Sequence, residues 1–135
     1  MKIKFHPEYY WLAIFAFCFI VYQQVQDNIR PNYHGNQEVI KYLLGIAPNF
    51  FPAIGIPSLF VVFIPVMSTQ KQINQWWYRN RQITANVLSL FGLLMWEFLQ
   101  VFTTKGHFDW NDVLWTLIGA FVFQKIWSFT PSVYK

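Results

Sequence analysis

Long uncharged runs alternate with short charged segments along this chain, and four of the runs are long enough to cross a lipid bilayer. An ionised side chain at the bilayer centre costs about 2.5–3.5 kcal/mol, so gaps between charges mark candidate membrane spans. The gaps are 9–26, 42–70, 82–104 with only Glu97, and 113–134 with only Lys125. We therefore predict an all-α polytopic membrane protein, one transmembrane domain over residues 1–135, with four helices near 9–26, 49–68, 84–104 and 112–129.

The second span departs from this pattern because it begins with several prolines. Pro48, Pro52, Gly55 and Pro57 fall close together, and each interior proline removes a backbone donor and clashes with the carbonyl four residues earlier. We therefore predict a proline-interrupted span. Either a broken or re-entrant piece lines a cavity on the outer side, or the segment lies among the headgroups and the helix starts at Pro57. Residues 36–45 predict a separate short interfacial helix.

Positive charge sets the expected orientation. On one side of the four spans lie seven basic residues, against three on the other, which predicts that both termini are cytoplasmic (N-in/C-in). The seven are Lys2, Lys4, Lys71, Arg79, Arg81, Lys125 and Lys135, and the three are Arg30, Lys41 and Lys105. No small-x-small cleavage site follows the first apolar run, so we expect it to remain as a helix.

Composition supports a membrane protein and excludes several other classes. The chain is 55% hydrophobic and only 12% charged, whereas globular domains carry about 25% charged residues. Ten basic residues are too few and too scattered for a nucleic-acid-binding stripe, so we expect no nucleic-acid partner. The single cysteine, Cys18, excludes an intramolecular disulfide and a cysteine-based zinc site.

Polar residues of the third span share one helical face. At about 100° per residue, they fall within an arc of about 80°, and they are Asn86, Ser89, Glu97, Gln100 and Thr104. We expect this stripe to face the bundle interior or a wet cavity rather than lipid. Glu97 lies about 10 Å below the outer end of the helix, still at hydrocarbon depth. Its carboxyl either serves a ligand site or bonds to a neighbouring helix, and the sequence favours neither.

The stripe leads to a polar mouth between the third and fourth spans. Asp109 and Asp112 there are expected to cap the fourth helix, or to join a site with His107. On the fourth helix Asp112, Thr116 and Gly119 share a face, and Gly119 comes level with Glu97, leaving room for its side chain or for water. The candidate ligand-binding residues are Glu97, Gln100, His107, Asp109, Asp112, Thr116 and Gly119.

Catalytic and metal motifs are not found in the sequence. No Ser/His/Asp constellation, P-loop or dinucleotide-binding glycine pattern occurs. A divalent-ion site or proton relay on His107, Asp109, Asp112 and Glu97 is an alternative with a weak signal, since no second histidine stands at helical spacing. We therefore predict no catalytic residue, no metal and no cofactor.

The last two spans resemble the C-terminal half of VanZ-like membrane proteins, small bacterial proteins named after a teicoplanin-resistance determinant. The matching residues, in order and spacing, are Glu97, Gln100, Phe108, Asp109, Asp112, Val113 and Gly119. The chain departs from the family pattern at three positions: Gly106 replaces an arginine, Thr116 replaces an asparagine and Phe123 replaces a glycine. The resemblance covers about 30 of the 135 residues. It implies a multi-pass protein of the bacterial cytoplasmic (inner) membrane, with a link to envelope-acting lipophilic glycopeptides.

Together these features give two functional hypotheses. The leading one is a non-enzymatic, bilayer-embedded protein whose outer-leaflet polar pocket binds a lipid headgroup or small amphiphile. The alternative is a structural or accessory subunit that packs against a larger membrane partner or against copies of itself, with the polar groups joining helices. A small transporter is a further alternative and would need oligomerisation. A membrane-bound transferase is not supported, because the sequence contains no recognisable pair of nucleophile and base.

Overall fold

The computed structural model describes residues 6–69, 75–103 and 106–135, and the side chains of residues 68 and 69 are not described. Lys2, Lys4, Lys71 and Lys105, on which the predicted orientation partly depends, and Thr104 of the polar stripe lie outside the described residues. The described part is helical and contains no strand, so the predicted all-α class is confirmed. Its elements are α1 (Pro7–Gln23), a π-helix (Gln24–Ile29), α2 (Arg30–Asn32), α3 (Glu38–Thr69), α4 (Gln75–Arg79), α5 (Arg81–Gln100), α6 (Trp110–Phe129) and a 3₁₀ turn (Ser132–Tyr134).

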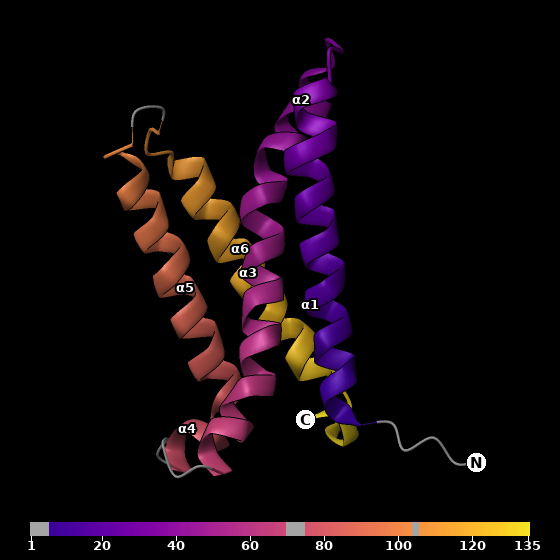
Figure 1. The fold of residues 1–135 in the computed structure, drawn as a ribbon, viewed down its shortest axis with the longest axis vertical. Coiled ribbons are helices and arrows are strands. Elements are labelled where there is room, and N and C mark those ends of the chain that lie inside the picture. Colours follow the sequence, from indigo (N-terminus) through magenta and orange to yellow (C-terminus); the bar gives the residue numbers. More distant parts are fainter. Residues whose placement is uncertain (1–5, 70–74, 104–105) are drawn as a thin grey trace, which may run out of the picture.

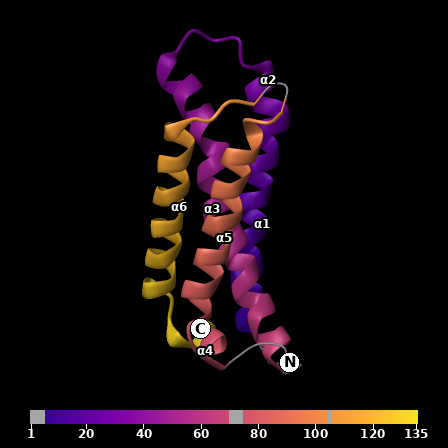
Figure 2. The same cartoon turned by 90° about the vertical axis from the view of Figure 1, so that its left-hand side faces the viewer.

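Helix α3 is the centre of the bundle. It packs against α1, α5 and α6, and α5 packs against α6, whereas the backbone of α1 approaches neither α5 nor α6. Figures 1 and 2 show these long helices side by side, with α1 and α5 on opposite flanks of α3. The arrangement leaves α1 attached to the bundle through α3 along most of its length.

The end where α1 begins and α6 finishes, here called the closed end, is filled by aromatic side chains. Trp11, Val61 and Phe123 form a buried cluster there. The Trp11 indole stacks on Trp127 with ring centroids 5.0 Å apart, and its Nε1 donates a hydrogen bond of 2.7 Å to the Tyr134 carbonyl. These side chains bridge α1 and α6 where their backbones stay apart.

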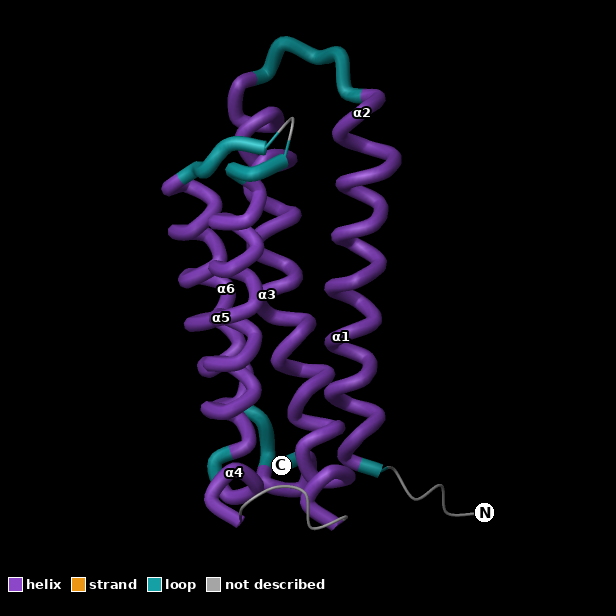
Figure 3. Tube along the Cα trace, turned by 60° about the vertical axis from the view of Figure 1, so that its left-hand side comes forward, coloured by secondary structure: helices purple, strands orange, loops and turns teal. Residues whose placement is uncertain are grey.

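The opposite end, here called the open end, is where α3 and α6 begin. Residues 33–37, which lead into α3, and the short segment 106–109 before α6 both lie there (Figure 3). The first described residues of α1 and the 3₁₀ turn therefore share one end of the bundle, and the connections into α3 and α6 share the other.

Two of the described helices are long and apolar enough to cross a membrane. They are the Glu38–Met67 part of α3 and the whole of α5. Both overlap predicted spans. Helices α1 and α6 also match predicted spans in position, but α1 has only 17 residues before the π-helix begins at Gln24. The chain is thus a candidate membrane protein with two helices of spanning character among the described residues.

The predicted interruption of the second span is wrong. Helix α3 is assigned as one helix of 32 residues with Pro48, Pro52, Pro57 and Pro65 inside it. The separate helix over 36–45 is wrong for the same reason, since α3 starts at Glu38 and runs through Gly45. Each proline removes one helical donor, but packing against three neighbouring helices stabilises the remainder, and a continuous helix keeps the other backbone groups bonded where water is scarce.

Candidate functional site

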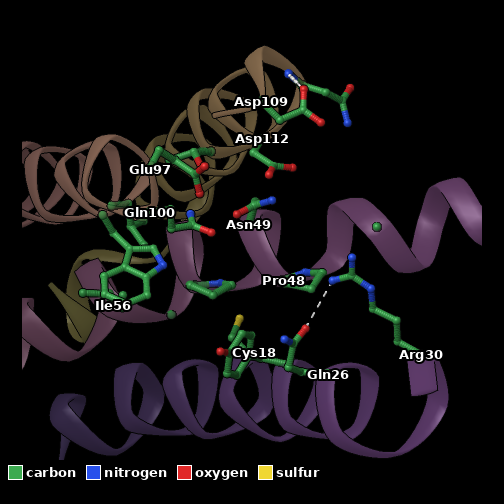
Figure 4. Close-up of a pocket in the computed structure, with 18 of the residues that line it drawn as sticks. Cys18, Gln26, Arg30, Pro48, Asn49, Ile56, Glu97, Gln100, Asp109 and Asp112 are labelled. Atoms are coloured by element: carbon green, nitrogen blue, oxygen red, sulfur yellow. Dashed lines mark hydrogen bonds between the residues drawn. The ribbon is translucent and has the colours of Figure 1, made fainter. Parts of the chain in front are cut away.

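A cavity of about 990 Å³ lies between α1, α3, α5 and α6 toward the open end. Helices α1 and α5 both contribute to its lining although their backbones do not contact each other. The cavity therefore occupies the space that α3 and α6 leave between the two flanking helices. Figure 4 shows its lining from α1, α3, α5 and α6.

Most of the residues chosen from the sequence come together in this cavity. Glu97 and Gln100 reach it from α5, and Thr116 from α6, while the rest stand at the mouth: His107, Asp109 and Asp112. Gly119 is not in the lining. A Cβ atom built on Gly119 would stand 2.7 Å from the Phe50 carbonyl oxygen, so this residue lies against the backbone of α3.

The expectation that the polar stripe of α5 faces the interior is confirmed for Asn86, Ser89 and Glu97, which are all buried. The stripe has two parts with different contacts. Toward the closed end, Asn86 Nδ2 donates to the Ala120 carbonyl of α6 at 3.1 Å, and Ser89 Oγ bonds back to Ala85 within α5 at 2.7 Å. Only the part that begins at Glu97 reaches the cavity.

Glu97 is the deepest acidic group of the cavity lining. Glu97 is only 3% exposed, and its Oε2 atom is buried without a hydrogen-bond partner. Within the described ranges, the one ion pair joins His6 and Glu8 at the closed end, so no basic side chain lies within 4.0 Å of Glu97. The Gln100 side chain hydrogen-bonds to this carboxyl, but Oε2 is left without a donor, which is costly for a buried carboxylate oxygen and favours a ligand group that donates to it.

Asp109 has a structural role in addition to its place in the lining. It is the N-cap of α6, and its Oδ1 accepts a hydrogen bond of 2.8 Å from the Asn111 backbone N–H. Asp112 follows in the first turn, where the positive end of the helix dipole favours a carboxylate. The capping interpretation is confirmed for Asp109.

Sequence reasoning missed the wall that faces these acids. The cavity is also lined by Gln26 and Arg30 beyond α1 and by Lys41 and Asn49 of α3. Gln26 lies in the π-helix, and its Oε1 accepts a hydrogen bond of 3.5 Å from Arg30 Nη1. The polar run that follows the first apolar span was the signal available in the sequence. The π-helix itself is a structural feature that is frequent at functional sites.

Tyr42 of α3 links the two sides of the mouth. Its hydroxyl donates to Asn111 Oδ1 at 3.1 Å and accepts from Trp115 Nε1 at 2.9 Å. Both partners belong to α6, so the first turns of α3 and α6 are tied together at the open end. These bonds join the helices that carry Lys41 and Asp112 at the mouth of the cavity.

Polarity changes along the depth of the cavity. Its charged residues stand near the open end of each helix, whereas farther along the helices the lining is apolar, with Phe15, Phe19, Ile56, Leu93 and Trp96. A molecule with a polar head and an apolar body matches this order. Among the described residues, no group of three or more His, Cys, Asp or Glu side chains is arranged to hold a metal ion.

Comparison with known proteins gives no relative. No family model, curated protein or solved structure matches the chain.

Proposed function

We propose that this chain is a VanZ-like multi-pass protein of the bacterial cytoplasmic membrane that binds a lipid headgroup or small amphiphile in the cavity at its open end. In this proposal α1, α3, α5 and α6 all cross the bilayer, both termini are cytoplasmic, and the open end lies in the outer leaflet. The resemblance at Glu97, Gln100, Asp109 and Asp112 supports the family, and through it a role in the cell envelope toward lipophilic glycopeptides.

The observation that carries the proposal is the placement of Glu97. A carboxyl that is 3% exposed and has an oxygen without a partner lines a cavity of about 990 Å³. Purely structural polar groups in membrane bundles bond to a neighbouring helix, as Asn86 does. Thr84 Oγ1 and Asn86 Oδ1 are also buried without a partner but lie outside the cavity, whereas Glu97 Oε2 belongs to its lining, which favours a partner that enters from outside the chain.

The route into the cavity supports an amphiphile in particular. The backbones of α1 and α5 do not approach each other, although both helices line the cavity. In this proposal an acyl chain lies between α1 and α5 while the headgroup stays among the polar residues of the mouth. A soluble ligand has no need of such a lateral route.

The test is native mass spectrometry of gently purified protein. We expect a discrete bound mass in the wild type and lower occupancy in Glu97→Gln, which keeps the size of the side chain. Gly45 lines the cavity, and a Cβ atom there meets nothing within 4 Å, so Gly45→Leu should fill the cavity and abolish binding. Gly92 is equally uncrowded but outside the lining, so Gly92→Leu is the matched control and should retain the bound mass.

Other outcomes separate the two functional hypotheses. Absence of any bound small molecule from the wild type would contradict the proposal. A co-purifying protein that is retained in Gly45→Leu would instead support the accessory-subunit alternative. Equal retention of a lipid in Gly45→Leu and Gly92→Leu would place the lipid outside the cavity.

A further inference from the structure

The walls of the cavity carry opposite charges. Carboxyl groups gather on the side formed by α5 and α6, at Glu97, Asp109 and Asp112, and Arg30 lies across from them. Glu38 and Lys41 of α3 also belong to the lining. Figure 4 shows Arg30 and Gln26 on the α1 side of the cavity and the three carboxylates on the other, with Asn49 between. The two groups are not paired, since no described acid of the cavity lies within 4.0 Å of a basic nitrogen.

The acidic wall needs a donor that reaches Glu97. Burial of a charged carboxyl is tolerated when a cation or several hydrogen-bond donors accompany it. Arg30 lies on the opposite side, where its Nη1 donates a hydrogen bond of 3.5 Å to Gln26 Oε1, and Asp109 is already engaged as the N-cap of α6. On the side formed by α5 and α6, the oxygens left for an incoming donor are Glu97 Oε2 and those of Asp112, with the Gln100 and Asn49 amides also in the lining.

An organic ammonium suits these oxygens better than a metal ion. The described acids, histidines and cysteine form no cluster that could hold a metal. A primary ammonium is a compact charge with three N–H donors, so it can bond to two carboxylates and an amide oxygen at once. A quaternary ammonium has no N–H and cannot satisfy Glu97 Oε2.

We propose that the cavity binds a zwitterionic lipid through a primary ammonium group placed between Glu97 and Asp112, with the lipid phosphate facing Arg30 on the opposite wall. This inference rests on the proposed function and adds the headgroup class. Arginine and lysine are the usual protein partners of phosphate. The carboxylates of the α5 and α6 side and Arg30 on the other side match the two charges of one headgroup, and the apolar lining below accepts the start of its acyl chains.

The experiment compares lipids that differ only in the headgroup. Full-length protein, stripped of lipid in detergent, is titrated with dioleoyl phosphatidylethanolamine, phosphatidylcholine and phosphatidylglycerol, and binding is followed by native mass spectrometry. One charge-assisted network in a partly buried site predicts that the ethanolamine lipid binds about tenfold tighter than the choline lipid. Free phosphoethanolamine, which lacks acyl chains, should bind weakly or not at all.

Three variants test the assigned walls. Glu97→Gln should lower affinity for the ethanolamine lipid to that for the choline lipid and leave the choline lipid unchanged, and Asp112→Asn should do the same to a smaller extent. Arg30→Gln should lower the affinity for all three lipids by the same factor, because all three carry a phosphate. Glu8→Gln, at the closed end, is the control and should alter none of them, and size-exclusion profiles show which variants fold.

The outcomes keep this inference separate from the proposed function. Binding of all three lipids with equal affinity would overturn the ammonium assignment while leaving an amphiphile-binding cavity in place. Preference for phosphatidylglycerol or phosphatidylcholine would also overturn it, and equal binding of free phosphoethanolamine would show that the source of the ammonium is a soluble amine. Binding of no lipid would overturn both.

Discussion

Gly119 of α6 lies so close to Phe50 of α3 that a Cβ atom on the glycine would stand 2.7 Å from the phenylalanine carbonyl oxygen. The same Cβ atom would stand 2.7 Å from the Ala53 methyl carbon. The two helices therefore meet backbone to backbone at this point, in the way that small residues allow in membrane bundles. The contact lies about one turn below Thr116, which lines the cavity.

Replacement of this glycine should loosen the bundle. In Gly119→Ala the new methyl group meets backbone that cannot rotate away, and overpacking of this kind costs about 1–3 kcal/mol. We expect a lower midpoint of thermal unfolding, measured by circular dichroism in detergent. Gly92→Ala is the matched control, because its Cβ atom meets nothing within 4 Å, and it should be neutral or slightly stabilising. Equal midpoints for the two variants would contradict the close contact.

The long helices and the polar stripe were predictable because the signals behind them are local. Gaps between charges gave the helices, and a spacing of 3.6 residues placed Asn86, Ser89 and Glu97 on one buried face. The cap at Asp109 was equally local, since an N-cap needs only an acceptor next to the first free amides. The mouth residues could therefore be chosen from the sequence around the fourth span.

Long-range packing was not predictable from the same signals. The clustered prolines predicted a break, but α3 stays one helix that packs against α1, α5 and α6. Arg30 and Lys41 were used only for topology, because nothing in their neighbourhood shows that α2 and α3 bring them into the cavity that Asp112 also lines. Gly119 was placed on the correct helix face for a cavity, but α3 fills the space beside it.

The bond between Asn86 and the Ala120 carbonyl should contribute to the α5–α6 contact. Asn86→Ala removes a donor that crosses between helices at 3.1 Å, and such bonds contribute about 0.6–2 kcal/mol in membrane proteins. We expect a lower unfolding midpoint than in Ser89→Ala, since the Ser89 hydroxyl bonds only within its own helix. If the unfolding midpoint falls as far in Ser89→Ala as in Asn86→Ala, burial alone, and not the bond between the helices, stabilises this contact.

The aromatic cluster of the closed end should fix α1 to the C-terminal segment. Trp11→Phe keeps a ring against Trp127 but removes the donor to the Tyr134 carbonyl, a loss of about 0.5–1.5 kcal/mol. Trp11→Ala also empties a buried site and should cost about 3–5 kcal/mol. Trp110→Phe, at a residue 75% exposed, should leave the unfolding midpoint unchanged. The measurement is circular dichroism, which does not depend on the number of tryptophans.

The proposed orientation makes a prediction about which loops reach the outside of the cell. Cys18 is the single cysteine and lies against Gly55 between α1 and α3, so Cys18→Ser provides a background without thiols. His34 at the open end and Ser132 at the closed end are both exposed. In spheroplasts, His34→Cys should react with a membrane-impermeant maleimide at once, and Ser132→Cys only after permeabilisation, because the bundle separates the two ends by the thickness of the bilayer.

The labelling pattern also distinguishes the number of crossings. With the open end outside and both ends of the chain inside, each long helix must cross once, whereas a chain that crosses only through α3 and α5 leaves α1 and α6 on the surface. Asn111→Cys, at the start of α6, is a further single substitution in the same background. It should react in intact spheroplasts, as His34→Cys does, because Tyr42 holds the starts of α3 and α6 together. Labelling of all three positions in intact spheroplasts would contradict a spanning bundle, and the reverse pattern would contradict the cytoplasmic termini.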